Sequence, residues 1–172
     1  MAFSEPWNHN MISISLCRCM LLVMALQTAL AVQAAPAHSP EQFKISVSGI
    51  RSGKSIELRD GKLICSSLEY WRPVREKASK PSAQAWKAFR AELDQLAAWD
   101  WEGSYVNPQV EDGTQCSVSI RYSDKFIESS GRNQFPGDGR SVVPPGGISI
   151  SFRQFIASVG KLSQGCRLLE IS

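Results

Sequence analysis

Histidine is scarce in this sequence, with two residues among 172. One of them, His38, lies outside the N-terminal apolar region, in a segment of alanine, serine and proline that is typical of a flexible tail. A folded domain without histidine lacks the Ser-His-Asp and Cys-His forms of nucleophilic catalysis and the usual histidine-containing zinc sites. The sequence therefore predicts no catalytic residue, no metal ligand and no bound cofactor.

Long apolar runs are also missing. The charge-free run from Met20 to Val32 is shorter than the roughly 20 residues that a membrane-spanning helix needs. Arg18 precedes this run and the small residues around Ala34 follow it, which is the order of a cleavable signal peptide. We expect residues 1–34 to be that signal peptide, with residues 1–10 as an extension if translation starts at Met11; an uncleaved anchor is the alternative.

Cleavage after Ala34 leaves 138 residues, the size of one ordinary domain, and residues 35–37 offer a second cleavage site. The nearest approach to a basic cluster consists of Arg72, Arg75, Lys77 and Lys80. Acidic residues interrupt it, and no stripe of cations with interleaved aromatics, as on a nucleic-acid-binding surface, is present. We therefore expect a periplasmic or secreted protein with a flexible tail over 35–41 and a single domain over 42–172. It should bind no nucleic acid and keep no membrane anchor after cleavage.

Alternation of apolar and polar residues predicts antiparallel strands at the start of this domain. Residues 42–48 alternate with period two, as in a strand with one buried face. The pair Asp60-Gly61 separates apolar runs over 55–59 and 62–65, which predicts a tight hairpin. The charged segment from Arg72 to Pro81 contains proline and predicts a solvated connection.

Two later segments have helical periodicity. The first follows Ser82, a plausible N-cap, and places Trp86, Phe89, Leu93 and Leu96 on one face. The second places Phe152, Phe155, Ile156, Val159 and Leu162 on one face, and Gly165 is positioned to end it. Strand periodicity returns at 116–120 and around 126–130, and a last short strand is possible at 167–171. This order predicts an α+β fold: an antiparallel sheet of about four to six strands, with two amphipathic helices covering one face.

Several short motifs lie close together between residues 82 and 163. They are Trp86-x-x-Phe89, Leu93-x-x-Leu96, Trp99-x-Trp101, Tyr105, Asp112-Gly113-Thr114 and Ser130-Gly131-x-Asn133-x-Phe135-Pro136. This pattern resembles a family of uncharacterised bacterial secreted or cytosolic domains in which it precedes an amphipathic C-terminal helix. The chain departs from the pattern at Cys116, where a tryptophan is expected, and in an insertion over 138–147. The resemblance implies a bacterial origin and supports the fold, and it implies no particular chemistry.

Aromatic and acidic residues gather after the first predicted helix. The rings of Trp99, Trp101 and Tyr105 could form a stacking platform for a sugar or a protein, but a core position for at least one of them is favoured. The acids Asp100, Glu102, Glu111 and Asp112 could supply a carboxylate pair for glycoside hydrolysis or for calcium. Their spacing matches no calcium loop, so solvated turns are the favoured interpretation.

The long connection over 131–147 is the predicted recognition surface, because loops of this length are often functional. Arg132, Asn133, Gln134 and Phe135 are its candidate partner-binding residues, although Asn133 could instead hydrogen-bond the loop backbone. We expect a non-enzymatic binding domain for a protein or saccharide ligand, for example an inhibitor of a secreted protein. A hydrolase that uses carboxylates is the alternative.

Three cysteines remain after residue 34, so an oxidising compartment allows one disulfide. We predict the pair Cys65 and Cys116, because both lie in strand-like segments whereas Cys166 follows the helix-ending Gly165. The rival pairing joins Cys116 to Cys166 and leaves Cys65 as a buried thiol.

Overall fold

The computed structural model describes residues 39–70, 72–137 and 148–169. All of them belong to one compact unit, which spans 36–172. The predicted signal peptide, most of the predicted tail and the insertion over 138–147 lie outside the described residues.

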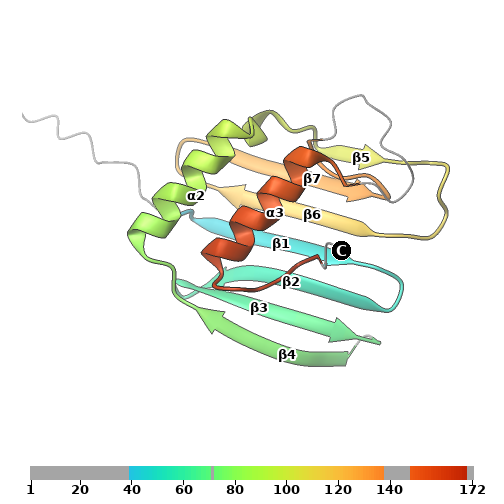
Figure 1. The fold of residues 1–172 in the computed structure, drawn as a ribbon, viewed down its shortest axis with the longest axis horizontal. Coiled ribbons are helices and arrows are strands. Elements are labelled where there is room, and N and C mark those ends of the chain that lie inside the picture. The colour runs from blue at the N-terminus through green and yellow to red at the C-terminus, as the bar shows by residue number, and fades with distance from the viewer. Residues whose placement is uncertain (1–38, 71, 138–147, 170–172) are drawn as a thin grey trace, which may run out of the picture. The chain divides into compact units, whose positions relative to one another are not determined.

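The described residues form one sheet of seven strands, in the order β4-β3-β2-β1-β6-β7-β5 (Figure 1). The first four strands are β1 (Gln42–Ser48), β2 (Ser52–Arg59), β3 (Lys62–Glu69) and β4 (Arg72–Ser79). The other three are β5 (Ser104–Val106), β6 (Gln115–Arg121) and β7 (Phe126–Arg132). All neighbours are antiparallel except β5 and β7, which are parallel. The sheet is thus larger than the four to six strands expected.

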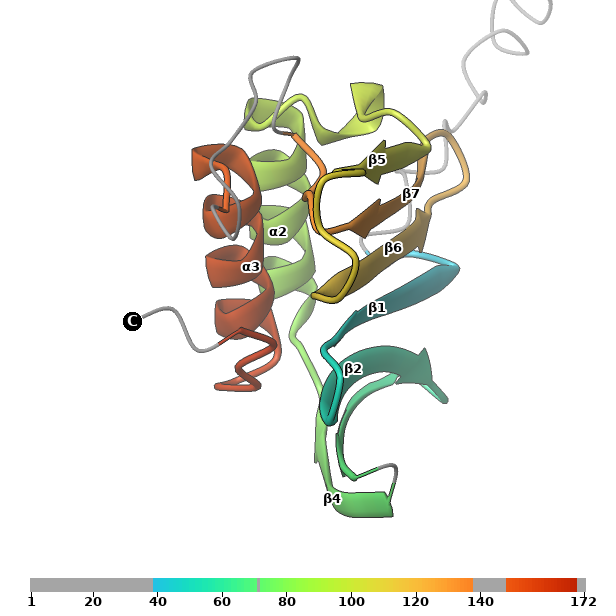
Figure 2. The same ribbon diagram turned by 90° about the vertical axis from the view of Figure 1, so that its right-hand side faces the viewer.

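Two helices cover one face of this sheet, so the predicted α+β fold is confirmed (Figure 2). Helix α2 (Ala83–Gln95) begins where the Ser82 side chain accepts a hydrogen bond from the Ala85 N–H (3.1 Å). Helix α3 (Ile150–Leu162) is capped in the same way by Ser149. Helix α3 buries all of its predicted apolar face, and α2 buries Trp86, Phe89 and Leu93, whereas Leu96 is half-buried at its C-cap. The rings of Phe89 and Phe155 meet between the helices, with centroids 6.3 Å apart.

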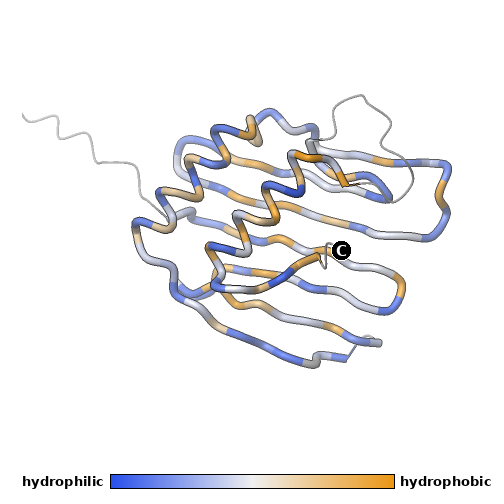
Figure 3. The backbone as a smooth tube through the Cα atoms, viewed as in Figure 1, coloured by the Kyte–Doolittle hydropathy of each residue, from blue (hydrophilic) through white to orange (hydrophobic). Residues whose placement is uncertain are grey.

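Hydrophobic and hydrophilic residues alternate along the strands (Figure 3), and successive side chains of a strand point to opposite faces of the sheet. The side chains of Phe43, Ile45 and Val47 in β1 are buried under the helices, while the residues between them are polar. On the opposite face, six neighbouring strands each contribute one serine to a row, and each serine lies directly opposite the serine of the next strand. The row consists of Ser66, Ser55, Ser46, Ser117, Ser130 and Ser104. This face is polar because no element of the described chain covers it.

One prediction about the strands is wrong, and one possible strand is absent from its described part. The charged segment after residue 71, predicted as a connection, is strand β4, which pairs with β3 at the edge of the sheet. Pro73 and the charged side chains are compatible with pairing on one side, and such residues discourage further strand addition on the other. The described part of 167–171, residues 167–169, has no strand, because this segment crosses the buried face and contributes Leu168 to the core.

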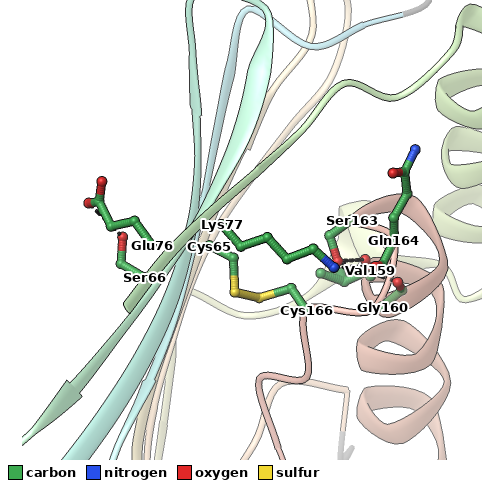
Figure 4. The surroundings of a disulfide bond; sticks show 9 residues. All are labelled: Cys65, Ser66, Glu76, Lys77, Val159, Gly160, Ser163, Gln164 and Cys166. Atoms are coloured by element: carbon green, nitrogen blue, oxygen red, sulfur yellow. Dashed lines mark hydrogen bonds between the residues drawn. A yellow bond between two sulfur atoms is a disulfide. The ribbon is translucent and has the colours of Figure 1, made fainter. Parts of the chain in front are cut away.

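Both predicted disulfide pairings are also wrong, because the bond joins Cys65 to Cys166, whose Cα atoms are 6.1 Å apart. Figure 4 shows the Cys65 side chain leaving β3 on the helix side of the sheet, where the chain returns after α3. Nearby, the Lys77 ammonium donates to the Gln164 carbonyl oxygen (3.0 Å). Although Cys166 follows the helix-ending Gly165, its side chain is only 4% exposed, and Cys116 is buried outside the disulfide.

Candidate functional site

An open groove of about 520 Å³ lies beside the first half of β7. One side consists of Asp94, Ala97, Trp99, Asp100 and Trp101, which follow one another from the end of α2 through a short 3-10 helix, η1 (Ala98–Asp100). The other side is formed by residues 124–128, which include the β6–β7 turn and the start of β7. We call this feature the β7 groove.

The groove exists because β5 covers only part of the β7 edge. β5 pairs with Ser130, Gly131 and Arg132, and it leaves the strand residues before Ser130 without a neighbouring strand on that side. The chain from α2 turns sharply at Ala97, whose φ of 48° is left-handed, and η1 then lies near this uncovered edge.

A half-buried arginine links helix α2 to the β6–β7 turn at one end of the groove. The Arg90 guanidinium donates two hydrogen bonds to the Asp124 carboxylate, at 2.9 and 2.6 Å. Its carbon Cζ lies 4.6 Å from the centre of the Tyr122 ring and 5.7 Å from that of Trp99. Arginine is suited to this position, because its planar fork pairs with a carboxylate while its face packs on aromatic rings. The hydrogen bonds from Arg90 lower the pKa of Asp124, and the same contact raises the pKa of Arg90.

A second charged pair fixes the orientation of Trp99. The Asp94 carboxylate accepts hydrogen bonds from the Lys125 ammonium (2.9 Å) and from the Trp99 indole N–H (2.7 Å). Both hydrogen bonds lower the pKa of Asp94, and the one from Lys125 has the larger effect. Lys125 Nζ also lies 5.3 Å from the centre of the Trp99 ring. The wall of the groove is therefore held by paired charges and needs no rearrangement to present its aromatic surface.

Tyr122 lies beneath this cluster and is 4% exposed. Its hydroxyl has no hydrogen-bond partner among the described residues, and desolvation raises its pKa to about 12. Tyr122 thus stays neutral over the physiological range and acts as an aromatic support for Arg90 and Trp99.

The remaining groups in the groove are exposed. Phe126 has 58% of its surface exposed, and the Arg121 guanidinium carbon lies 5.2 Å from its ring centre. The Asp100 carboxylate has no ion pair or side-chain hydrogen bond with the described part of the chain. The Glu128 carboxylate accepts one hydrogen bond, from the Ser119 hydroxyl (2.9 Å).

The predicted partner-binding residues lie at the other end of β7, and two of them have structural roles. Asn133 adopts a left-handed φ of 58° and its side-chain amide donates to the Val110 carbonyl oxygen (2.8 Å). Phe135 is 5% exposed and packs against Phe152, with ring centroids 4.8 Å apart. Arg132 is exposed and Gln134 is half-buried, so these two have accessible side-chain surface.

The aromatic cluster after α2 divides between core and surface. Tyr105 is 8% exposed, and its hydroxyl oxygen accepts from the Glu102 N–H (3.0 Å), which confirms a core position for at least one ring. Trp101 is half-buried against Phe155, with ring centroids 5.2 Å apart. Trp101 and Trp99 both reach the groove.

The four candidate acids are divided between two loops and are all exposed. Asp100 lines the β7 groove, whereas Asp112 lines a separate hollow of about 250 Å³ together with Asn133. Within residues 39–70, 72–137 and 148–169, no three His, Cys, Asp or Glu side chains are grouped so that they could hold a metal ion.

Sequence reasoning missed the residues that build the groove wall. Arg90 and Asp124 are 34 positions apart, and Arg90 lies outside the apolar face by which the first helix is recognised. No local pattern marks such a pair, because each residue alone is typical of a solvated surface.

No family model matches this chain, and no curated protein matches it in sequence. The resemblance described above therefore stays a prediction.

Proposed function

We propose that this protein is an exported, non-enzymatic binding domain that recognises its partner through the β7 groove. The observation that carries the proposal is the aromatic surface of Trp99, Trp101 and Phe126, held open beside a strand edge by two preformed ion pairs. Exposed aromatic side chains on a rigid support are typical of recognition surfaces, because they contribute contact area at a low cost in conformational entropy.

The charges in the groove favour binding over catalysis. A general acid that works at neutral pH needs a raised pKa. Asp94 and Asp124 instead have lowered pKa values, because each accepts hydrogen bonds from a cation. Both carboxylates are therefore ionised and already engaged at neutral pH. Nothing in the described residues specifically favours the alternative of a carboxylate-based hydrolase.

Two features support export. The Cys65–Cys166 disulfide is the kind of bond that persists in oxidising compartments. The order of basic residue, apolar run and small residues before Ala35 is that of a signal peptide. Among the described residues, no helix is long and apolar enough to cross a membrane. We expect N-terminal sequencing of the exported protein to start at Ala35 or within a few residues of it; a periplasmic form that starts at Met1 or Met11 would contradict export by cleavage.

The recognition surface is tested by affinity capture from periplasmic extract with matched variants. Phe126→Ser removes an exposed ring from the groove, and Ile150→Ser removes a similarly exposed side chain, 76% exposed, at the start of α3. We expect a specific partner to be retained by the wild type and by Ile150→Ser and to be lost with Phe126→Ser. If Phe126→Ser captures the same partner as strongly as the wild type, the groove is not the recognition surface.

A further inference from the structure

We infer that the β7 groove accepts an extended peptide segment of a partner protein, and that this segment carries lysine or arginine side chains. The inference rests on the proposed function and specifies its ligand. It depends on three features of the groove: the direction of the strand backbone, the balance of charge and the exposed aromatic faces.

The backbone of β7 offers hydrogen-bonding groups to the groove. Ser130 N–H donates outward to the Gly103 carbonyl oxygen (3.0 Å), away from β6. Because the backbone groups of a strand point alternately to its two sides, the N–H and C=O groups of Phe126 and Glu128 also point away from β6. The hydrogen bond from Tyr122 N–H to the Lys125 carbonyl oxygen (2.8 Å), at the closed end of the hairpin, agrees with this alternation.

This edge can therefore accept a short added strand in line with β5. Glu102 and Gly103 lie beside Ser129 and the Glu128 carbonyl oxygen, so the uncovered part of β7 runs from Phe126 to Glu128. It extends about 7 Å, enough for a partner segment of two or three residues. Strand addition to a free edge is a recurrent mode of peptide recognition, in which the backbone supplies affinity and the side chains supply specificity. A saccharide would not match the regular spacing of these backbone groups.

The charge of the groove selects the side chains of that segment. Its lining contains four carboxylates and one ammonium group, and the ion pairs with Arg90 and Lys125 engage Asp124 and Asp94. The carboxylates of Asp100 and Glu128 have no cationic partner among the described residues. With the guanidinium groups of Arg90 and Arg121 beside the lining included, the four carboxylates face three cations, an excess of one negative charge. The chain as a whole has a formal charge of +3, so the groove differs in sign from the overall balance.

The aromatic residues add to this preference. Cations already lie over three rings in or beside the groove: Arg90 over Tyr122, Lys125 over Trp99 and Arg121 over Phe126. Phe126 and the half-buried Trp101 retain exposed surface beside Asp100 and Glu128. An incoming guanidinium or ammonium group can thus contact a carboxylate and an aromatic face together.

The test is a titration of the exported, disulfide-bonded protein, followed by backbone and indole NMR signals. The probes are a capped pentapeptide of sequence Arg-Val-Arg-Val-Arg, its counterpart Glu-Val-Glu-Val-Glu, and chitotetraose. We expect the arginine peptide to shift the amide signals of Phe126 and Glu128 and the indole signal of Trp101. The glutamate peptide should leave these signals unchanged.

Charge dependence is tested with paired variants of equal charge change. Asp100→Asn with Glu128→Gln should weaken binding of the arginine peptide by about threefold to tenfold, the range for two exposed ion pairs. Glu111→Gln with Asp112→Asn removes two exposed acids from a loop outside the groove, and should change the affinity by less than about twofold. Equal weakening by both pairs would overturn the inference, because only the net charge would then matter.

The other outcomes separate the inference from the proposed function. If chitotetraose shifts the groove signals and the arginine peptide does not, the site binds saccharide and the peptide inference is wrong, while the recognition surface stands. Equal binding of the two peptides would overturn the selection for cations. If no probe shifts the groove signals, the inference fails, and the capture experiment with Phe126→Ser then decides independently whether the groove is a recognition surface.

Discussion

The disulfide should supply much of the free energy of unfolding of this protein. It joins residues 101 positions apart, and it fixes the segment that follows α3 against β3. Closing a loop of about 100 residues removes chain entropy from the unfolded state, which corresponds to about 4.7 kcal/mol at 25 °C. Because measured values are often smaller than this entropy model predicts, we expect Cys65→Ser with Cys166→Ser to lower the free energy of unfolding by about 2–5 kcal/mol.

Urea unfolding, followed by tryptophan fluorescence with and without reductant, measures this effect. The wild type should lose stability on reduction and should then match the double-serine variant, whose own stability should not respond to reductant. Alkylation before reduction should label Cys116 alone, and only after unfolding, because Cys116 is buried outside the disulfide. A difference of less than about 1 kcal/mol between the oxidised wild type and the double variant would refute the reasoning.

Three further predictions concern stability. Gly131→Ala should destabilise by about 1–3 kcal/mol, because the added methyl would clash with a backbone carbonyl and a buried sulfur, whereas Gly49→Ala meets nothing and should change little in the same urea assay. Tyr122→Phe should raise the thermal midpoint, because it removes a buried hydroxyl that has no partner among the described residues; a lower midpoint would show that the hydroxyl is satisfied. The pKa values of Asp94 and Asp124 are lowered by folding, so their ion pairs stabilise the protein above about pH 4 and this stabilisation is lost as the pH falls through the lowered pKa values. Thermal midpoints measured from pH 7 to pH 2.5 should fall less steeply for Asp94→Asn with Asp124→Asn than for the wild type; parallel curves would contradict the assignment.

Local sequence patterns predicted the elements whose own periodicity decides their structure. The strand over 42–48 and both helices were located correctly, because a segment with one apolar face has one favourable way to bury it. The hairpin at Asp60-Gly61 was also located, and both residues have the positive φ that its tight turn requires.

Elements whose structure depends on a neighbour were not predicted. β4 has the composition of a solvated loop, and it forms a strand because β3 offers it an edge with which to pair. β5 has three residues and pairs with a strand that comes more than twenty positions later in the chain. The disulfide pairing also depends on a distant segment. The chain after α3 returns to β3 and places Cys166, rather than Cys116, beside Cys65.

Composition and periodicity are sufficient to assign the fold class and the core faces of the helices, and to show that the segment after His38 contains no histidine. The position of the candidate site, in contrast, depends on contacts between segments that are distant in the sequence. The β7 groove depends on β5 ending its pairing with β7 at Ser130, and on Arg90 meeting Asp124 across 34 positions. Neither contact can be recognised from the neighbouring sequence. In particular, a charged residue on a helix or in a turn looks the same in the sequence whether it is solvated or paired. Only the packing of α2 against the sheet brings Arg90 and Asp124 together.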